Sequence, residues 1–344
     1  MRTTTASQMS LYTHRRAVDP VSPEPISGTV RAMTEVAPAR FGAVEAGGTK
    51  FVCLLGSSPD QIEARTRIPT GADPAAALAE VVAFFAGSSP PAAVGIASFG
   101  PVELRPGHPH YGHITSTPKP GWRDADLVGP IRAALGVPIG FDTDVAGAAL
   151  GEGRWGAARG LSTFVYMTVG TGIGAAAVVG GRPASGLGHA EMGHIAVPRQ
   201  PGDTYPGRCP YHGDCLEGMA AGGAIAERFG RPGESLDGDE LRQAVDWQAG
   251  YLAEGLRTIV YTIAPERIVI GGSVAELPGL FPLVRAKLVE TLAGYGALPE
   301  HAADDFVVPA GLGGLAGPAG ALVLAENALL AEDVEPGARA TAHG

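Results

Sequence analysis

The sequence predicts an α/β protein made of two similar halves that face each other across a cleft. A strand, a glycine-rich turn and a returning strand begin at Phe41, and the same design recurs about 120 residues later, at Phe164. Strands alternate with helical patterns between and after these two hairpins. Asp144 falls just past the carboxyl end of an apolar strand, where open α/β sheets place their ligands. Together these features predict a duplicated domain with a ligand site in the cleft.

Each expected element follows from its local pattern. The first hairpin has its strands at 41–46 and 50–55, and the second at 164–169 and 175–179. Between the hairpins we expect helices and strands in turn, at 73–85, 93–98, 125–135, 138–142 and 145–153. An apolar helical face over 252–263 ends before Pro265, and a buried strand at 267–270 runs into Gly271-Gly272-Ser273. The last helix is expected at about 318–331.

The composition bounds the class of protein. A length of 344 residues, with 45% hydrophobic and 17% charged residues, fits a soluble globular protein of two domains. The net charge of -10 argues against nucleic-acid binding, because phosphate contacts need clustered Lys and Arg. No apolar run looks long enough to span a bilayer, and three cysteines do not make a secreted disulfide framework. We therefore expect a cytoplasmic protein without membrane contact.

The two ends of the chain differ from the rest. Residues 1–40 mix Thr, Ser, Pro and Arg without periodic apolar spacing or a secretory h-region. We expect a disordered extension there and a short flexible tail over 333–344.

Four potential metal ligands gather in a short stretch of sequence: His194, Cys209, His212 and Cys215. Two thiolates and two imidazoles suit tetrahedral zinc. Glu191 and Glu217 flank these ligands, so an ion would bring two carboxylates together that could hold neighbouring hydroxyls of a sugar. Two alternatives stay open, namely a zinc staple without a part in catalysis and a redox disulfide between Cys209 and Cys215.

The two glycine turns are candidate phosphate sites. The first contains Gly47, Gly48, Thr49 and Lys50, and offers backbone N–H groups, a hydroxyl and an ammonium, although a plain hairpin turn is the alternative. The second, Gly170-Thr171-Gly172-Ile173-Gly174-Ala175, satisfies the relaxed dinucleotide fingerprint. That fingerprint requires a helix to begin at the glycines, whereas a strand pattern follows here. A second phosphate turn opposite the first explains the sequence better than nicotinamide binding.

Two further positions have competing interpretations. Asp144 could serve as a general base or a metal ligand, or could simply cap the helix that follows. Trp122 lies in a loop with hydroxyls and a cation, a mixture suited to sugar recognition, but it could also anchor the loop on the core.

Taken together, these motifs resemble the ROK family of sugar kinases and repressors, from about Phe41 to the final helix. Glu45-Ala-Gly-Gly-Thr-Lys50 and Gly170-Thr-Gly-Ile-Gly174 resemble its two phosphate motifs. Glu191-Met-Gly-His194 is similar to its E-x-G-H motif, and the segment from Cys209 to Glu217 is similar to the zinc loop of its fructokinases. The family usually has Asn at the position of Ala146 and often has Asp at the position of Glu45.

The resemblance implies an actin-like (ribonuclease H-like) two-domain sugar kinase fold. One domain would comprise 41–155 with the C-terminal helix at about 318–332, and the other 156–317 with its zinc loop at 194–217. The implied activity is ATP-dependent phosphorylation of fructose to fructose 6-phosphate by a homodimer that uses Mg²⁺ and Zn²⁺. A glucokinase, a mannokinase and a sugar-sensing repressor are the alternatives, and the repressor would need a DNA-binding helix-turn-helix ahead of Phe41.

The resemblance also implies roles for individual residues. Asp144 would be the general base, and Trp122, Glu191, His194 and Glu217 would contact the sugar. Zinc would be held by His194, Cys209, His212 and Cys215. ATP would be bound by Gly47, Gly48, Thr49, Lys50, Thr171, Gly172, Gly271, Gly272 and Ser273.

Overall fold

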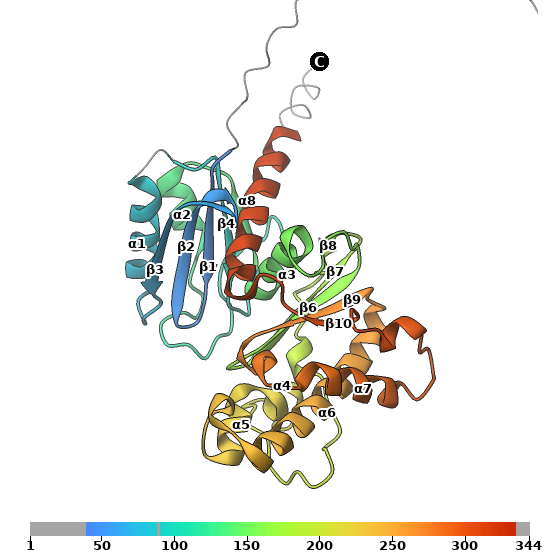
Figure 1. The fold of residues 1–344 in the computed structure, drawn as a ribbon. Coiled ribbons are helices and arrows are strands. Elements are labelled where there is room, and N and C mark those ends of the chain that lie inside the picture. The colour runs from blue at the N-terminus through green and yellow to red at the C-terminus, as the bar shows by residue number, and fades with distance from the viewer. Residues whose placement is uncertain (1–38, 88–89, 335–344) are drawn as a thin grey trace, which may run out of the picture. The chain divides into compact units, whose positions relative to one another are not determined.

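Two mixed five-stranded sheets with the same internal order form the frame of the protein (Figure 1). The computed structural model describes residues 39–87 and 90–334, which lie in one compact unit. The extension expected over 1–40 and the tail expected over 333–344 lie almost entirely outside the described residues.

The first sheet has the strand order β3-β2-β1-β4-β5. Its strands are β1 (Phe41–Ala46), β2 (Lys50–Ser58), β3 (Gln61–Pro69), β4 (Ala93–Ser98) and β5 (Ile139–Thr143). The first three strands form an antiparallel meander, and β4 and β5 continue from β1 in parallel. Strands β1 and β4 are buried on both faces, whereas the edge strand β3 alternates between exposed and half-buried residues.

The second sheet repeats this plan, with the order β10-β9-β6-β7-β8. Its strands are β6 (Phe164–Val169), β7 (Ile173–Val179), β8 (Arg182–Pro183), β9 (Arg267–Gly271) and β10 (Val307–Pro309). Again three antiparallel strands are followed by two that run parallel to the first. The duplication that the two hairpins predict is thus confirmed.

Helices cover the faces of both sheets (Figure 1). They are α1 (Pro74–Ala86), α2 (Val128–Leu135), α3 (Asp144–Trp155), α4 (Leu216–Ala220), α5 (Gly222–Phe229), α6 (Gly238–Ile263), α7 (Leu280–Leu292) and α8 (Ala316–Val334). Helices α1 and α2 share a core with one face of the first sheet, and α8 packs on its other face. Helices α6 and α7 pack on the second sheet. Helix α3 contacts both sheets, and its Val145 and Ala148 pack against Tyr166 of β6.

Helices α3 and α8 cross with almost no side chain between them. A Cβ atom added at Gly320 of α8 would lie 1.6 Å from the carbonyl oxygen of Gly147 in α3. The C-terminal helix therefore fixes the position of α3, whose first residue is Asp144.

One apolar segment departs from the sequence expectation. Gly313–Glu332 is long and apolar enough to cross a membrane by length and composition alone, although we expected no such run. In the structure it packs on the first sheet and buries Ala321, Leu322 and Ala325. Packing in the core of the protein is therefore enough to explain why this segment is apolar.

Candidate functional site

A cavity of about 800 Å³ collects side chains from both halves of the chain. Asp144 comes from the start of α3, Thr171 and Gly172 from the β6–β7 turn, and Glu191, His194, His212 and Glu217 from the segment after β8. An adjoining cavity of about 340 Å³ is lined by Glu45, Thr168, Gly271, Gly272 and Ser273, and by the chain around Gly313 and Gly314. Asp144, Val145 and Thr168 line both cavities, which therefore meet at the amino end of α3.

Asp144 is the first residue of α3, and its neighbour Thr143 caps the helix. The Thr143 hydroxyl accepts a hydrogen bond from the backbone N–H of Ala146 at 3.1 Å, so the capping role considered for Asp144 is filled by another residue. Asp144 Oδ1 accepts the N–H of Val145 at 2.8 Å. Burial, reinforced by the charge of Glu191, raises the pKa of Asp144 to about 6. A carboxylate with this pKa is mostly ionised at neutral pH and basic enough to accept a proton.

A second acidic side chain, Glu45, faces Asp144 across the smaller cavity. Burial and the charge of Asp144 raise its pKa to about 7, against the opposing effect of Lys50 and Arg65. Two buried carboxylates that line one cavity in this way would be stabilised by a bound cation.

Glu217 holds the second glycine turn in place. Its Oε2 atom accepts the backbone N–H of Ile173 at 2.9 Å, which links helix α4 to the β6–β7 turn. Glu191 lies on the rim of the same cavity, where its Oε1 is 3.4 Å from Nδ1 of His189. The other ring nitrogen of His189 accepts the N–H of Val102 at 3.1 Å, so this histidine joins the rim to the chain after β4.

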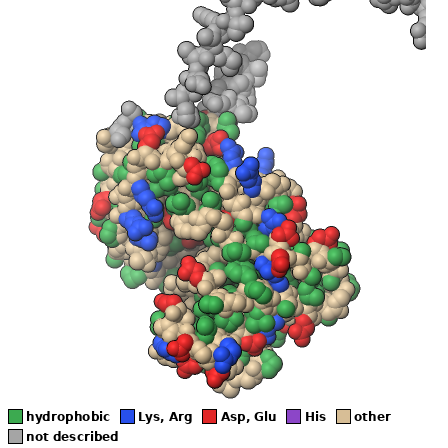
Figure 2. Space-filling view, in the orientation of Figure 1, with side chains coloured by type: hydrophobic (Ala, Val, Ile, Leu, Met, Phe, Trp, Pro, Cys, Tyr) green, Lys and Arg blue, Asp and Glu red, His purple; other side chains and the backbone are tan. Residues whose placement is uncertain are grey.

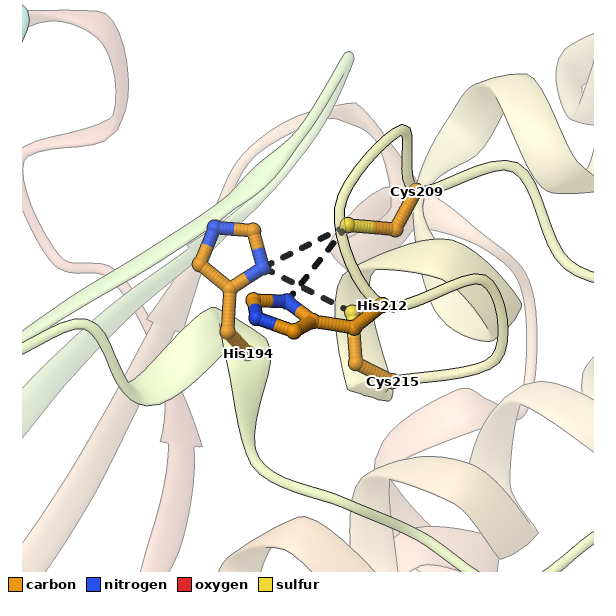
Figure 3. A group of neighbouring side chains, drawn as sticks. All are labelled: His194, Cys209, His212 and Cys215. Atoms are coloured by element: carbon orange, nitrogen blue, oxygen red, sulfur yellow. Dashed lines mark hydrogen bonds between the residues drawn. The ribbon is translucent and has the colours of Figure 1, made fainter. Parts of the chain in front are cut away.

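The four expected metal ligands lie together and point toward a common centre (Figure 3). Their ligand atoms all lie within 4.8 Å of one another. Cys209 Sγ is 3.7 Å from His194 Nδ1 and 3.8 Å from His212 Nδ1, and Cys215 Sγ is 3.5 Å from His194 Nδ1. Tetrahedral zinc with ordinary Zn–N and Zn–S bonds would place its N and S ligands about 3.6 Å apart. The donor set and its spacing therefore fit zinc, and both thiols are free rather than joined in a disulfide.

The two glycine turns differ in their surroundings. Thr171 and Gly172 line the large cavity, and Thr171 also borders a third cavity of about 280 Å³ with Ser273. The first turn is more open, since Gly48, Thr49 and Lys50 are exposed. The backbone N–H of Gly47 donates to the carbonyl of Lys50 at 3.1 Å, and the carbonyl of Gly47 accepts a hydrogen bond from the Thr70 hydroxyl at 2.7 Å. These bonds fix the turn as a tight hairpin.

The ROK family profile matches residues 41–328 of the chain. The chain belongs to the ROK family. It is 41% identical to a fructokinase of Pediococcus pentosaceus over 289 residues, which cover 84% of this chain and 98% of that protein. A fructokinase of Zymomonas mobilis is 42% identical, with coverage of 83% and 96%. Among solved structures, a ROK hexokinase from Thermus thermophilus superposes with a TM-score of 0.68 at 27% identity, covering 86% of this chain and 99% of that one. The ROK fold explains the paired sheets and agrees with the actin-like architecture that we expected.

The structure does not bear out the sugar contact that we expected for Trp122. Its side chain is fully buried, packs against Phe51 and Phe99, and donates from its indole nitrogen to the carbonyl of Gly71 at 3.0 Å. It therefore anchors its loop on the core and does not contact a sugar. Its neighbour Arg123 lines the large cavity instead.

Sequence reasoning also missed His189, which contacts the nearby Glu191 and, far away in the chain, Val102. No local spacing signals such a contact, because the partner Val102 precedes it by 87 residues. Ala146, at a position where the ROK family usually has Asn, lies in α3 with its side chain buried in the core, and it lines none of the cavities described above.

Proposed function

We propose that this ROK protein is a fructokinase that transfers the γ-phosphoryl group of ATP to fructose and releases fructose 6-phosphate and ADP. Its similarity to two fructokinases over most of their length supports the substrate. The observation that carries the proposal is the position of Asp144 where the two cavities meet. A residue there can touch a sugar hydroxyl in one cavity and face a nucleotide's terminal phosphate in the other.

In the proposed reaction Asp144 is the general base. It accepts the proton of the sugar's 6-hydroxyl while that oxygen bonds to the γ-phosphorus, and the bond from this phosphorus to the bridging oxygen of ADP breaks. Phosphoryl transfer depends mainly on alignment and on neutralising charge. The bond between Val145 N–H and Asp144 Oδ1 fixes the carboxylate relative to the helix and leaves Oδ2 for the hydroxyl.

The nucleotide would lie in the smaller cavity and the one beside it. Gly271 and Gly272 line the smaller cavity at the end of β9, and Ser273 lines both cavities. Thr171 of the β6–β7 turn lines the second of them, whereas its neighbour Gly172 lines the large cavity. The turn from Gly47 to Lys50 would supply a cation and N–H groups from the opposite side. Mg²⁺ would neutralise phosphate charge when bound with ATP, and Glu45 is the side chain positioned to hold it or its water ligands.

The sugar would lie in the large cavity, in contact with Glu191, His194 and Glu217. We propose a structural role for zinc held by His194, Cys209, His212 and Cys215, because four protein ligands leave no open coordination position. Zinc would hold the loop that carries Glu217 against the cavity. The homodimer and the cytoplasmic location stay predictions, as does the division into two domains.

A coupled assay that measures ADP release with fructose, mannose and glucose tests the substrate. We expect the highest kcat/KM with fructose, and a clear preference for glucose or mannose would contradict the proposal. Asp144→Asn should lose on the order of 10²–10⁴ in kcat and still bind fructose.

Asp142→Asn is the matched control for the catalytic residue. Asp142 lies two residues away, and burial also raises its pKa to about 6, but it lines none of the cavities described above. Its variant should retain most activity. Equal losses in the two variants would show that Asp144 acts through the fold rather than on the substrate.

A further inference from the structure

An arginine that the proposed reaction does not use lines the third cavity, which measures about 280 Å³. This residue, Arg208, directly precedes the expected metal ligand Cys209. Its side chain is 34% exposed, so part of its surface is free to meet a ligand. The buried apolar side chains of Ile225, Val274 and Leu277 line the same cavity. The cavity thus combines an apolar wall with one guanidinium group.

Two acceptors hold the edge of the Arg208 guanidinium. Its Nε donates to Glu227 Oε1 at 3.0 Å, and its Nη1 donates to the carbonyl of Thr171 at 3.4 Å. The Glu227 carboxylate also accepts a hydrogen bond from the Tyr205 hydroxyl, so this acceptor is itself held in place. Because a guanidinium group is planar, two contacts along its edge fix the direction in which its flat faces point.

The charge of Arg208 is balanced locally. Arg208 pairs with Glu227, and nearby in the chain Arg231 pairs with Glu240 at 2.6 Å. Figure 2 shows blue and red side chains next to one another over this part of the surface, around α5. Glu234 adds a further carboxylate to the cavity wall. A paired arginine in such surroundings has little charge to offer to a phosphate, but its flat faces can still stack on a ring.

Gly223 of α5 lies against one of these faces. A Cβ atom added there would lie 2.2 Å from Nη1, 2.3 Å from Cζ and 2.8 Å from Nε of Arg208. A point in the guanidinium plane at the first two distances would be either much nearer to Nε or much farther from it, so this Cβ would lie over the flat face. Gly223 does not have a positive φ. A side chain at this position would therefore be costly because it displaces Arg208, and not because of the backbone conformation.

The other face of the guanidinium has no aromatic partner within the protein. Among the described residues, aromatic rings lie over Arg154 and Arg228, but none lies over Arg208. We propose that Arg208 stacks on the base of the bound nucleotide and favours purine over pyrimidine bases. The inference rests on the proposed function, which places the nucleotide in this cavity. Stacking on a delocalised plane grows with the area of overlap, and a purine has two fused rings where a pyrimidine has one.

Direct binding of ADP and CDP tests the proposal without any need for fructose. Each nucleotide is titrated calorimetrically into the full-length protein, and we expect ADP to bind more tightly than CDP. Arg208→Ala should weaken ADP binding on the order of tenfold and CDP binding by less, which narrows the ratio between the two affinities. A ratio that stays at the parent value would overturn the proposal.

Arg208→Lys separates stacking from charge, because lysine keeps the positive charge but has no flat group. We expect Arg208→Lys to bind ADP as weakly as Arg208→Ala does. If the lysine variant binds ADP like the parent, the charge acts on the phosphates and the stacking contact is refuted.

A double-mutant cycle tests the contact between Arg208 and Gly223. Gly223→Ala should weaken ADP binding in the parent protein, because its Cβ displaces the guanidinium. The same substitution should have no further effect in the Arg208→Ala variant, which serves as its matched background. Equal weakening in both backgrounds would show that residue 223 acts without Arg208, contrary to the proposed arrangement.

The outcomes also distinguish this inference from the proposed function. A parent protein that binds neither nucleotide would overturn both proposals. Tight ADP binding that Arg208→Ala leaves unchanged would overturn only the stacking contact. ADP binding that depends on Arg208, in a protein inactive on fructose, would refute only the proposed substrate.

Discussion

Replacing Glu152 with Gln should destabilise the protein through a single buried carboxylate. Glu152 lies near the end of α3 and is fully buried. Its Oε2 accepts backbone N–H groups of Ala157 at 2.7 Å and Gly311 at 3.0 Å, and its Oε1 accepts that of Leu312 at 2.8 Å. These donors lie on the two connections between the sheets, one after α3 and one before α8. Glu152 therefore ties both connections to one helix.

The expected cost follows from these three bonds. Glutamine has one acceptor oxygen, which can still accept two of the three N–H groups. Because this oxygen carries no charge, each of these two hydrogen bonds stabilises the fold by about 1 kcal/mol less than before. The third N–H then faces an amide NH₂ group and loses its partner, at about 1–3 kcal/mol. The sum is roughly 3–5 kcal/mol. With a urea m-value of about 3 kcal/mol/M for a chain of this size, the unfolding midpoint should fall by about 1–1.7 M.

Urea unfolding followed by circular dichroism measures this shift. The control is Glu326→Gln on α8, whose carboxylate pairs with Arg154 at 3.4 Å on the surface. Removing such a surface pair should cost about 0–1 kcal/mol. If Glu152→Gln moves the midpoint no further than the control, the carboxylate does not hold the connections and the reasoning is wrong.

Four other outcomes follow from the same structure. The kcat/KM should fall as the pH drops through about 6, because only ionised Asp144 accepts a proton; a flat pH profile from neutral pH down to 5 would contradict this. Because burial raises the folded-state pKa of Asp144 from 3.8 to about 6, its ionisation costs stability above that range, so Asp144→Asn should melt at a higher temperature at pH 8 and lose this advantage as the pH falls toward 4. Complete removal of metal by a chelator should lower the melting temperature, as should His212→Ala, and an unchanged melting curve would exclude a structural zinc. Gly320→Ala should cost about 1–3 kcal/mol in urea unfolding and also lower kcat, since its Cβ would collide with Gly147 and displace α3; full stability would mean that the two helices separate without cost.

Much of the fold was readable from local sequence patterns. The strand predicted at 41–46 matches β1, and the repeated hairpins anticipated the shared order of the two sheets. Strand β3 was missed, because it is a half-exposed edge strand whose residues are mostly polar. Helix α2 begins three residues later than predicted, because the Asp126 carboxylate accepts the N–H groups of Val128 and Gly129 and holds the chain in a turn.

The parts of the site that could be predicted are those whose residues lie close together in the sequence. The clustering of His194, Cys209, His212 and Cys215 and the position of Asp144 at the start of a helix could be predicted from residue types and neighbouring elements. Trp122 was misassigned, because an indole that anchors a loop and one that faces a ligand have the same local sequence. The proximity of Lys50 and Arg67 could not be foreseen either, since the two residues meet only through the pairing of β2 with β3.

The packing of α8 also affects how the protein can fold during synthesis. This helix covers β1, β2, β4 and β5, which are all made long before it. Domains of a nascent chain generally fold in order from the amino terminus. Here, however, the first sheet keeps an uncovered apolar face until the ribosome has released nearly the whole polypeptide. We therefore expect the second sheet to reach its native packing first, and truncation before Ala316 to yield an aggregation-prone product.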